Sequence, residues 1–236
     1  MLRKRDFYHQ RIKYSFHYHA NRIDKLSAQN HDLKYMAQYF KRVYNGKIPN
    51  QLFNSHEIQR ISRFKIKGIK RAFLNSFSKK LIRSEKILTL DPHSDLPAYA
   101  KKVYESYKKN SIPSKPGHDP VLKNILIKNE NAVAIEVPIW KKKNNNFLTG
   151  HIDLIQIENN LIKIIDYKPE GNFLYSLPQV ATYGLISKEI LGLDAIKCIS
   201  FNKNEAWQYD PLILLTDIKK YLMEKGYNKR PWEDFL

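Results

Sequence analysis

The sequence predicts an α/β fold in which a mixed central β-sheet is flanked by helices. Three apolar, β-branched runs, at residues 132–140, 147–157 and 161–168, are separated by short polar turns. This pattern predicts a three-stranded antiparallel meander. A helical stretch and a further strand-like run follow, so we expect a parallel crossover strand at residues 196–201. The N-terminal half shows the apolar spacing of helices and completes the predicted fold as a basic helical region.

The N-terminal part, residues 1–110, is expected to contain most of the helices. The apolar spacing predicts helices at residues 7–26, 31–44, 57–82 and 95–109. The next segment, residues 111–120, holds three prolines and a glycine and is predicted to be the boundary between two parts of the chain. Residues 111–236 are therefore expected to form a second part that contains the meander, preceded by a short helix at residues 121–128.

The C-terminal elements follow the third strand. A helix is expected at residues 175–191, with Pro178 in its first turn and Gly192 at its end. We expect the crossover strand to be followed by a fifth strand at residues 205–209 and a closing helix at residues 212–225. An aromatic tail at residues 231–236 is expected to dock onto the body of the protein.

Charge is distributed unevenly along the chain, whose formal net charge is +18. Residues 1–110 hold 25 Lys and Arg against 8 Asp and Glu, whereas residues 111–236 hold 16 against 15. A basic field attracts polyanions, so nucleic acid is the expected partner. The candidate contacts form a cluster whose members are Lys65, Lys67, Lys70 and Arg71. The alternative is a lysine-rich surface that reflects compositional bias alone.

Two turns determine the predicted pairing of the meander strands. In a two-residue hairpin centred on Asn159–Asn160, cross-strand partners have numbers that sum to 319, so Asp153 lies opposite Asp166. A turn centred on residues 144–145 gives partners that sum to 289, which places Glu136 opposite Asp153. Three carboxylates are therefore expected side by side, with directly opposed Cβ atoms about 4.5–5.5 Å apart.

Such a row of carboxylates requires compensation. Two unit charges about 5 Å apart repel by about 3 kcal/mol at an effective dielectric of about 20. The carboxylates must therefore take up protons or bind a cation, and hard oxygen ligands suit Mg²⁺ or Mn²⁺. Lys168, two residues beyond Asp166, projects from the same face and is placed to act on a bound water or phosphate. The alternative is a set of solvated charges on an exposed sheet face.

The same stretch resembles a known family. Residues 150–153 (GHID), 166–168 (DYK) and 179–183 (QVATY) match G-x-x-D, D-x-K and Q-x-x-x-Y in order and spacing. These are the motifs of the RecB-like branch of the PD-(D/E)xK nuclease superfamily, and the resemblance covers about residues 119–211. The chain departs from the branch at Ile152, where proline is common. Its single cysteine, Cys198, cannot build the four-cysteine iron–sulfur cluster of some relatives.

The resemblance implies a Mg²⁺- or Mn²⁺-dependent nuclease, either an exonuclease or an endonuclease, that acts most readily on DNA in repair, recombination or the metabolism of viruses and mobile elements. It implies a catalytic set of Asp153, Asp166, Lys168, Gln179 and Tyr183. The expected metal ligands are Asp153, Asp166, Glu136 and, as the nearest match to an upstream histidine of the family, His118. The carbonyl of Tyr167 is a possible further ligand. A helix face satisfied by local hydrogen bonds is the alternative for Gln179 and Tyr183, and a helix N-terminal residue without chemistry is the alternative for His118.

The remaining expectations concern location and alternative functions. No apolar run approaches the length of about 18 residues that a spanning helix needs, so no membrane partner is expected. The basic N-terminus lacks the apolar stretch of a secretory signal, and one cysteine fits a reducing cytoplasm. The alternatives to a nuclease are an inactive nucleic-acid-binding module and an interaction subunit of a DNA-processing complex.

Overall fold

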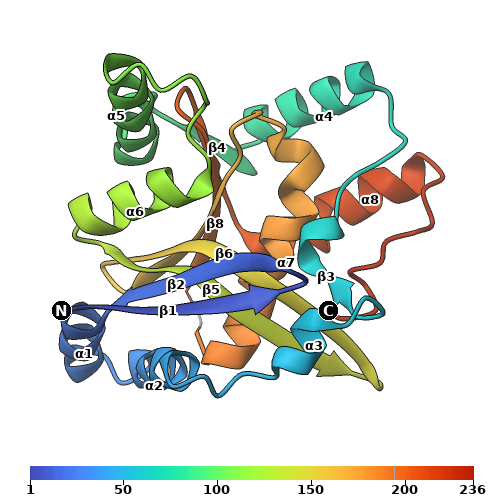
Figure 1. Cartoon of the computed structure of the whole chain (residues 1–236). Helices are drawn as coiled ribbons and strands as arrows, with labels where there is room; N and C mark the ends of the chain where they lie inside the picture. Colours follow the sequence, from blue (N-terminus) through green and yellow to red (C-terminus); the bar gives the residue numbers. More distant parts are fainter. Residues whose placement is uncertain (194) are drawn as a thin grey trace.

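The computed structural model describes residues 1–193 and 195–236 and confirms the predicted α/β fold (Figure 1). Within these residues, nine strands form one mixed sheet with helices on both faces. The strands are β1 (Leu2–His9), β2 (Ile12–His19), β3 (Gln59–Arg60), β4 (Ile87–Leu90), β5 (Ala132–Lys143), β6 (Asn146–Glu158), β7 (Leu161–Tyr167), β8 (Ile196–Phe201) and β9 (Ala206–Tyr209). The helices are α1 (Ala20–Gln29), α2 (Leu33–Tyr44), α3 (Asn50–Asn54), α4 (Arg71–Arg83), α5 (Asp95–Lys109), α6 (His118–Lys128), α7 (Phe173–Leu191) and α8 (Asp217–Glu224), with 3₁₀ turns η1 (Ile61–Arg63) and η2 (Pro211–Leu214).

The sheet has the strand order β1-β2-β5-β6-β7-β8-β9-β4, and β3 pairs with β6 outside this path. The predicted antiparallel meander is β5, β6 and β7, and the predicted crossover strand β8 is parallel to β7. Strands β1 to β4, all from residues 1–110, join the same sheet as the strands of the second half. The two halves of the chain therefore share one framework.

The predicted register of the meander is confirmed by the pairs next to the carboxylates, although neither Glu136–Asp153 nor Asp153–Asp166 is itself a pair of the ladder. Pairs flanking Glu136 and Asp153, such as Val137 with Ile152, have numbers that sum to 289, and Leu154 pairs with Ile165 at a sum of 319. Both turns have two asparagines with positive φ, between 48° and 63°. Type I′ hairpin turns need this conformation at both central positions, and asparagine adopts it more readily than most residues.

The predicted helix over residues 7–26 is wrong in its first part, where β1 and β2 form a hairpin. On β1, Phe7 and His9 are buried and Tyr8 between them is exposed, which is the period of two of a strand. On β2, Phe16 and Tyr18 share one buried face, and His17 on the other face is buried as well. The turn residues, Gln10 and Arg11, have φ values of 52° and 66° but lack the asparagine or glycine that marks such a turn in a sequence. Helix α1 begins only at Ala20.

The predicted helix over residues 57–82 is also wrong in its first part. Residues 59–70 form β3, η1 and an extended segment, and α4 begins at Arg71. Phe64 and Ile66 are buried while Lys65 and Lys67 are exposed, which is the alternation of an extended chain. The backbone N–H of Ile66 donates to the carbonyl of Tyr175, 3.0 Å away, and ties this segment to α7.

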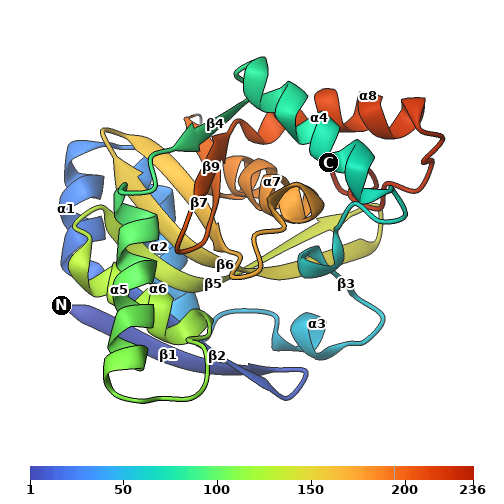
Figure 2. The ribbon, with the colours of Figure 1, turned by 90° about the horizontal axis from the view of Figure 1, so that it is seen from above.

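The two faces of the sheet carry separate cores (Figure 2). Helices α5 and α6 cover one face, whereas α7, with α2, α4 and α8 around it, belongs to the core on the other. Along β7, Ile165 is buried toward α5 and α6, and Ile164 is buried toward α7. Because side chains alternate along a strand, Asp166 shares the α7 face with Ile164.

The remaining elements differ from prediction in detail. Helices α2, α5 and α6 lie where the sequence predicted them, and Gly192 ends α7 with a φ of 63°. Pro178 lies inside α7 and not in its first turn, because the helix begins at Phe173. The predicted closing helix is divided into η2 and α8, and β4, which pairs with β9, was not predicted. The tail docks as expected, with Trp232 and Phe235 buried.

Candidate active site

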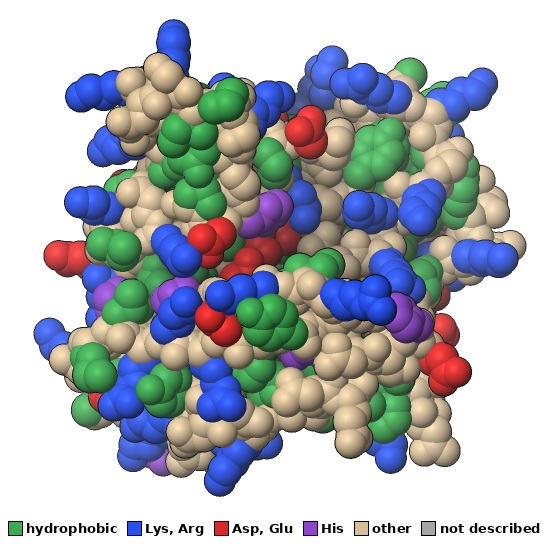
Figure 3. Space-filling view, viewed as in Figure 1, with side chains coloured by type: hydrophobic (Ala, Val, Ile, Leu, Met, Phe, Trp, Pro, Cys, Tyr) green, Lys and Arg blue, Asp and Glu red, His purple; other side chains and the backbone are tan. Residues whose placement is uncertain are grey.

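Six of the seven predicted catalytic and metal-binding residues line one cleft of about 440 Å³ where β5, β6 and β7 meet α6, α7 and the β1–β2 hairpin. Figure 3 shows acidic side chains at the bottom of a hollow in this face of the molecule, with Lys and Arg side chains around it. The predicted residues in its lining are His118, Glu136, Asp153, Lys168, Gln179, Tyr183 and Lys65. Asp166 lies beneath this surface, with 1% of its area exposed.

Asp166, Lys168 and Gln179 form a closed triangle of polar contacts. Lys168 Nζ lies 2.6 Å from Asp166 Oδ2 and donates to Gln179 Oε1 at 3.2 Å. Gln179 Nε2 donates to Asp166 Oδ1 at 3.1 Å. The predicted D-x-K and Q-x-x-x-Y residues are therefore brought together by the packing of α7 over the end of β7.

The environment of Asp166 disfavours its charged form. Burial is the largest cause, and the Asp153 carboxylate adds to it, so the pKa of Asp166 is raised to about 7 although Lys168 opposes the shift. For Lys168, burial works to lower the pKa, but the attraction of Asp166 and Asp153 outweighs it and the pKa is raised. Lys168 therefore remains protonated at neutral pH.

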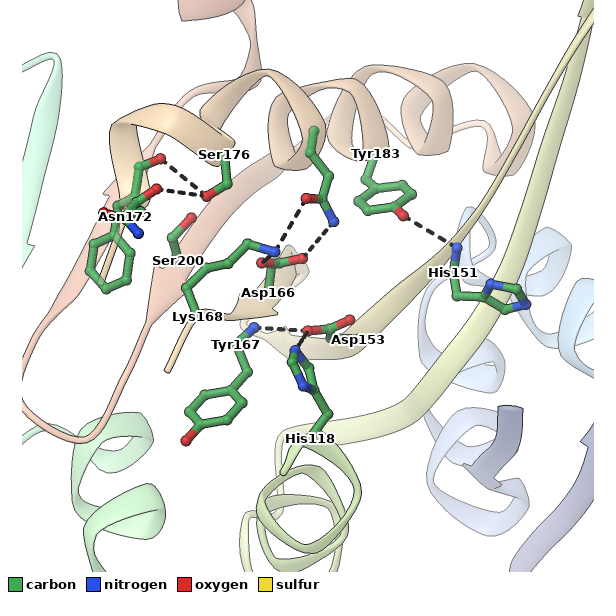
Figure 4. Close-up of polar contacts among 12 residues, drawn as sticks. His118, His151, Asp153, Asp166, Tyr167, Lys168, Asn172, Ser176, Tyr183 and Ser200 are labelled. Atoms are coloured by element: carbon green, nitrogen blue, oxygen red, sulfur yellow. Dashed lines mark hydrogen bonds and ion pairs between the residues drawn. The ribbon is translucent and has the colours of Figure 1, made fainter. Parts of the chain in front are cut away.

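Asp153 lies beside Asp166 at the point where β6 and β7 separate (Figure 4). Its Oδ2 accepts a hydrogen bond from the backbone N–H of Tyr167 at 2.9 Å. His118, at the start of α6, points toward the same oxygen, with Nε2 3.7 Å away (Figure 4). The predicted neighbours Asp153, Asp166 and His118 thus come from three different elements and meet at one place.

Glu136 occupies a break in the pairing of β5 with β6. Its φ of 51° is left-handed, and its pairing with Asp153 is absent from the ladder although the pairs on either side are formed. Burial and the nearby carboxylates, first that of Asp153, raise the pKa of Glu136 well above its usual value. The negative charge of Asp153 therefore acts on both Glu136 and Asp166.

The glycine of G-x-x-D makes room for the tyrosine of Q-x-x-x-Y. A Cβ at Gly150 would lie 2.6 Å from Tyr183 Cε1 and 2.8 Å from its hydroxyl oxygen. The Tyr183 hydroxyl accepts a hydrogen bond from the backbone N–H of His151 at 3.3 Å (Figure 4). Tyr183 is thus packed against the site strand β6, and it joins α7 to the carboxylates through that strand.

The predicted nucleic-acid-binding cluster lies beside this cleft. Lys65 lines it, and Lys65 and Arg71 line an adjacent hollow of about 540 Å³ that Lys168 also lines. Lys67 lines a third hollow near the C-terminal tail, and Lys70 is exposed just before α4. These four residues do not lie on one helix, as the sequence predicted, but on the extended segment and the start of α4. Within the described residues, none of them forms an ion pair.

Sequence reasoning missed the wall of the cleft that the N-terminal hairpin supplies. Lys13 and Tyr14 of β2, with Arg60 of β3, line the same cleft as the carboxylates. Strand β2 reaches this place because it pairs with β5 next to Glu136. No local motif marks this pairing, because it joins residues more than a hundred positions apart in the chain.

The oxygen donors of the site fit a hard divalent cation. In the described residues, no three His, Cys, Asp or Glu side chains stand close enough to enclose a metal ion. Asp153 and Asp166 nevertheless offer adjacent carboxylates, and Asp166 Oδ2 is buried with no partner besides Lys168. Mg²⁺ is commonly held by one or two carboxylates together with several waters and substrate phosphates. Asp153 and Asp166, with Glu136 beside them, would hold such an ion.

The Gly150–Tyr183 contact yields a prediction on stability. Gly150→Ala should lower the free energy of unfolding by about 1–3 kcal/mol, because a methyl group has no space beside the buried ring. Urea denaturation measures the effect. Gly117→Ala is the matched control, because a Cβ there meets nothing within 4 Å. Equal stability of the two variants would contradict the proposed packing role of Gly150.

Asp166 yields a prediction on pH. Between an unfolded pKa near the usual 3.8 and a folded pKa of about 7, the folded state binds one more proton than the unfolded state. Through this group, the stability of the metal-free protein should therefore fall as pH rises, by at most about 1.4 kcal/mol per pH unit. Asp166→Asn should remove this part of the fall. Thermal unfolding in chelator at several pH values measures it.

Asp24→Asn, an exposed change on α1, is the control for this experiment and should keep the wild-type pH dependence. The assignment of the raised pKa to Asp166 is wrong if Asp166→Asn and wild-type protein lose stability in parallel between pH 5 and pH 8.

Comparisons with known proteins leave the function open. No protein-family model matches the chain, and no curated protein matches it. Among solved structures, the crystal structure of SSO0001 is similar with a TM-score of 0.29 and 17% sequence identity, over 70% of this chain and 91% of that one.

Proposed function

We propose that this protein is a metal-dependent nuclease that hydrolyses phosphodiester bonds, with DNA as its substrate. The observation that carries the proposal is the closed contact of Asp166, Lys168 and Gln179 beside Asp153 in one cleft. Three separate sequence motifs, which resemble those of RecB-like nucleases, supply these residues. Because these four residues meet in one cleft, we favour one shared chemical role for them. Four unrelated structural roles would not require them to meet.

The carboxylates have the role of metal ligands in this proposal. Asp153 and Asp166 would hold Mg²⁺ or Mn²⁺, with Glu136 as a further ligand. The ion would lower the pKa of a bound water and neutralise charge on the phosphate. Burial is the largest cause of the raised pKa values of Asp166 and Glu136, and a bound cation would offset the second cause, which is the repulsion from neighbouring carboxylates.

Lys168 is the proton donor and positive charge of the site. Gln179 and Asp166 hold its ammonium group at the cleft surface, where it is partly exposed. A protonated lysine at this position orients a water through its lone pair or donates to a phosphate oxygen as negative charge develops. Gln179 positions Lys168, and Tyr183 holds α7 against β6 so that Gln179 remains in place.

The basic surface beside the cleft supports nucleic acid as the substrate. Lys65, Arg71 and Lys168 line the adjacent hollow, so positive charge continues from the carboxylates along the molecular surface. A charged backbone can follow such a path with phosphates paired to the exposed side chains. Lys65 and Arg71 lack carboxylate partners among the described residues and are available for this role, whereas Lys168 is paired with Asp166.

The first prediction from this proposal concerns metal and Lys168. Digestion of linear, circular, single-stranded and branched DNA should require Mg²⁺ or Mn²⁺, stop in chelator and proceed poorly with Ca²⁺. Asp166→Ala and Lys168→Ala should each lower the rate about 10²-fold or more, because each removes a group that acts on the reacting phosphate or water. DNA binding should remain close to that of the wild type.

Lys197→Ala, a change at a half-buried lysine of β8 outside the cleft, is the control and should keep the wild-type rate. Full activity in chelator, or a wild-type rate for Lys168→Ala, would refute the proposed site. Tight DNA binding without metal-dependent cleavage would instead identify a binding module that uses the fold without turnover.

The second prediction concerns the basic cluster. Reversing Lys65, Lys67, Lys70 and Arg71 to Glu should weaken DNA binding and reduce the dependence of log K on log salt, by about 0.9 per lost duplex phosphate contact. The four side chains are exposed, so the fold should persist. Fluorescence anisotropy at several salt concentrations measures both quantities.

The matched control makes the same change in charge on α5, at Lys101, Lys102, Lys108 and Lys109. This control should reduce affinity less and leave the salt slope closer to that of the wild type. If both sets of substitutions lower the affinity and the salt slope equally, DNA binding depends on the overall positive charge of the protein and not on the surface beside the cleft.

A further inference from the structure

Arg60 is a buried arginine without a carboxylate partner. Its side chain lines the cleft, and 8% of the residue is exposed. Within the described residues, no Asp or Glu lies within ion-pair distance of Arg60. Its Nε is buried and has no hydrogen-bond partner. Arginine remains charged in proteins, so this positive charge has no carboxylate in contact with it.

The immediate neighbours of Arg60 are neutral. One terminal nitrogen donates to Gln10 Oε1 and the other to the Tyr14 hydroxyl, each at 3.0 Å. His9 and His151 lie near, and burial, with Arg60 as a further cause, lowers the pKa of both. These contacts use two of the five N–H groups of the guanidinium. The surroundings therefore hold Arg60 in place and leave its charge free for an anion.

A purely structural role explains only part of this arrangement. The contacts with Gln10 and Tyr14 fasten β3 to the N-terminal hairpin, and a neutral glutamine could make hydrogen bonds of the same kind. Burying an unpaired charge costs free energy, so a charge at a purely structural contact is unfavourable. An anion that binds in the cleft would offset this cost, and the planar fork of arginine suits phosphate oxygens.

We propose that Arg60 binds a phosphate of the DNA backbone next to the bond that is cleaved. This inference rests on the proposed function, because the ligand is the same nucleic acid. Arg60 lies in the same cleft as Asp153 and Lys168, on the wall that the hairpin supplies. Lys13 and Lys65 line this cleft as well, and Lys13 is paired with Asp6 at 2.9 Å. Arg60 therefore places the strand, whereas the carboxylates and Lys168 act on the scissile phosphate.

The test measures coupling between Arg60 and one phosphate. A short DNA strand is prepared as a series in which one phosphate at a time is replaced by a neutral methylphosphonate, and binding is measured with Ca²⁺ to suppress cleavage. Wild-type protein should lose affinity by about tenfold or more at one position near the cleavage site, since a charge-assisted hydrogen bond is removed. Arg60→Gln should bind unmodified DNA more weakly by a similar factor and lose nothing further at that position.

Arg63→Gln removes the same charge three residues away, and it should keep the loss at that position. If Arg60→Gln does not fold, Arg60→Lys keeps the charge without the fork and should show a smaller loss at the same position. If wild-type protein cleaves DNA but Arg60→Gln keeps every loss of affinity that the methylphosphonates cause, this inference is wrong and the proposed function still holds. Wild-type protein that neither binds nor cleaves DNA would overturn both.

Discussion

The contact between the buried carboxylate of Asp166 and the ammonium group of Lys168 is the constraint on which the site depends. Asp166 lies at the end of β7 with almost no exposed area, next to a second carboxylate. An uncompensated charge there would be costly, so the surrounding elements supply compensation. Lys168 follows directly after the strand, and α7 packs so that Gln179 reaches both groups. The two hydrogen bonds of Gln179 to this ion pair therefore link α7 to the end of β7.

The packing of α7 against β6 extends this constraint to the rest of the cleft. Tyr183 is buried against Gly150, and only the absence of a side chain at that glycine allows the approach. The contact lies one helical turn from Gln179 and three residues from Asp153. A shift of α7 that disturbed Tyr183 would also move Gln179 away from Asp166. The uncharged motif residues Gly150, Gln179 and Tyr183 thus help to fix the positions of the charged ones.

The sequence was sufficient to predict the meander and its carboxylates, because the strands are β-branched and two asparagine pairs mark their turns. It was insufficient for the N-terminal hairpin, whose turn residues Gln10 and Arg11 carry no turn signal. The extended segment around Lys65 was also missed, since its short alternation was overridden by a longer helical pattern. Pairing of β2 with β5 depends on contacts distant in sequence, and local patterns do not contain that information.

The cleft has an acidic floor and a basic wall. Carboxylates of β5, β6 and β7 form the floor, Lys13 and Arg60 stand on the hairpin side, and Lys65 lines the cleft and the hollow that Lys168 shares. Without a cation, the floor repels a phosphate that the wall attracts, so the two parts oppose each other when DNA approaches. A divalent cation bound to the carboxylates would make the floor attract a phosphate, and it would leave the positive charge of the wall unchanged. Metal and phosphate should therefore bind cooperatively, because each supplies the charge that the other lacks.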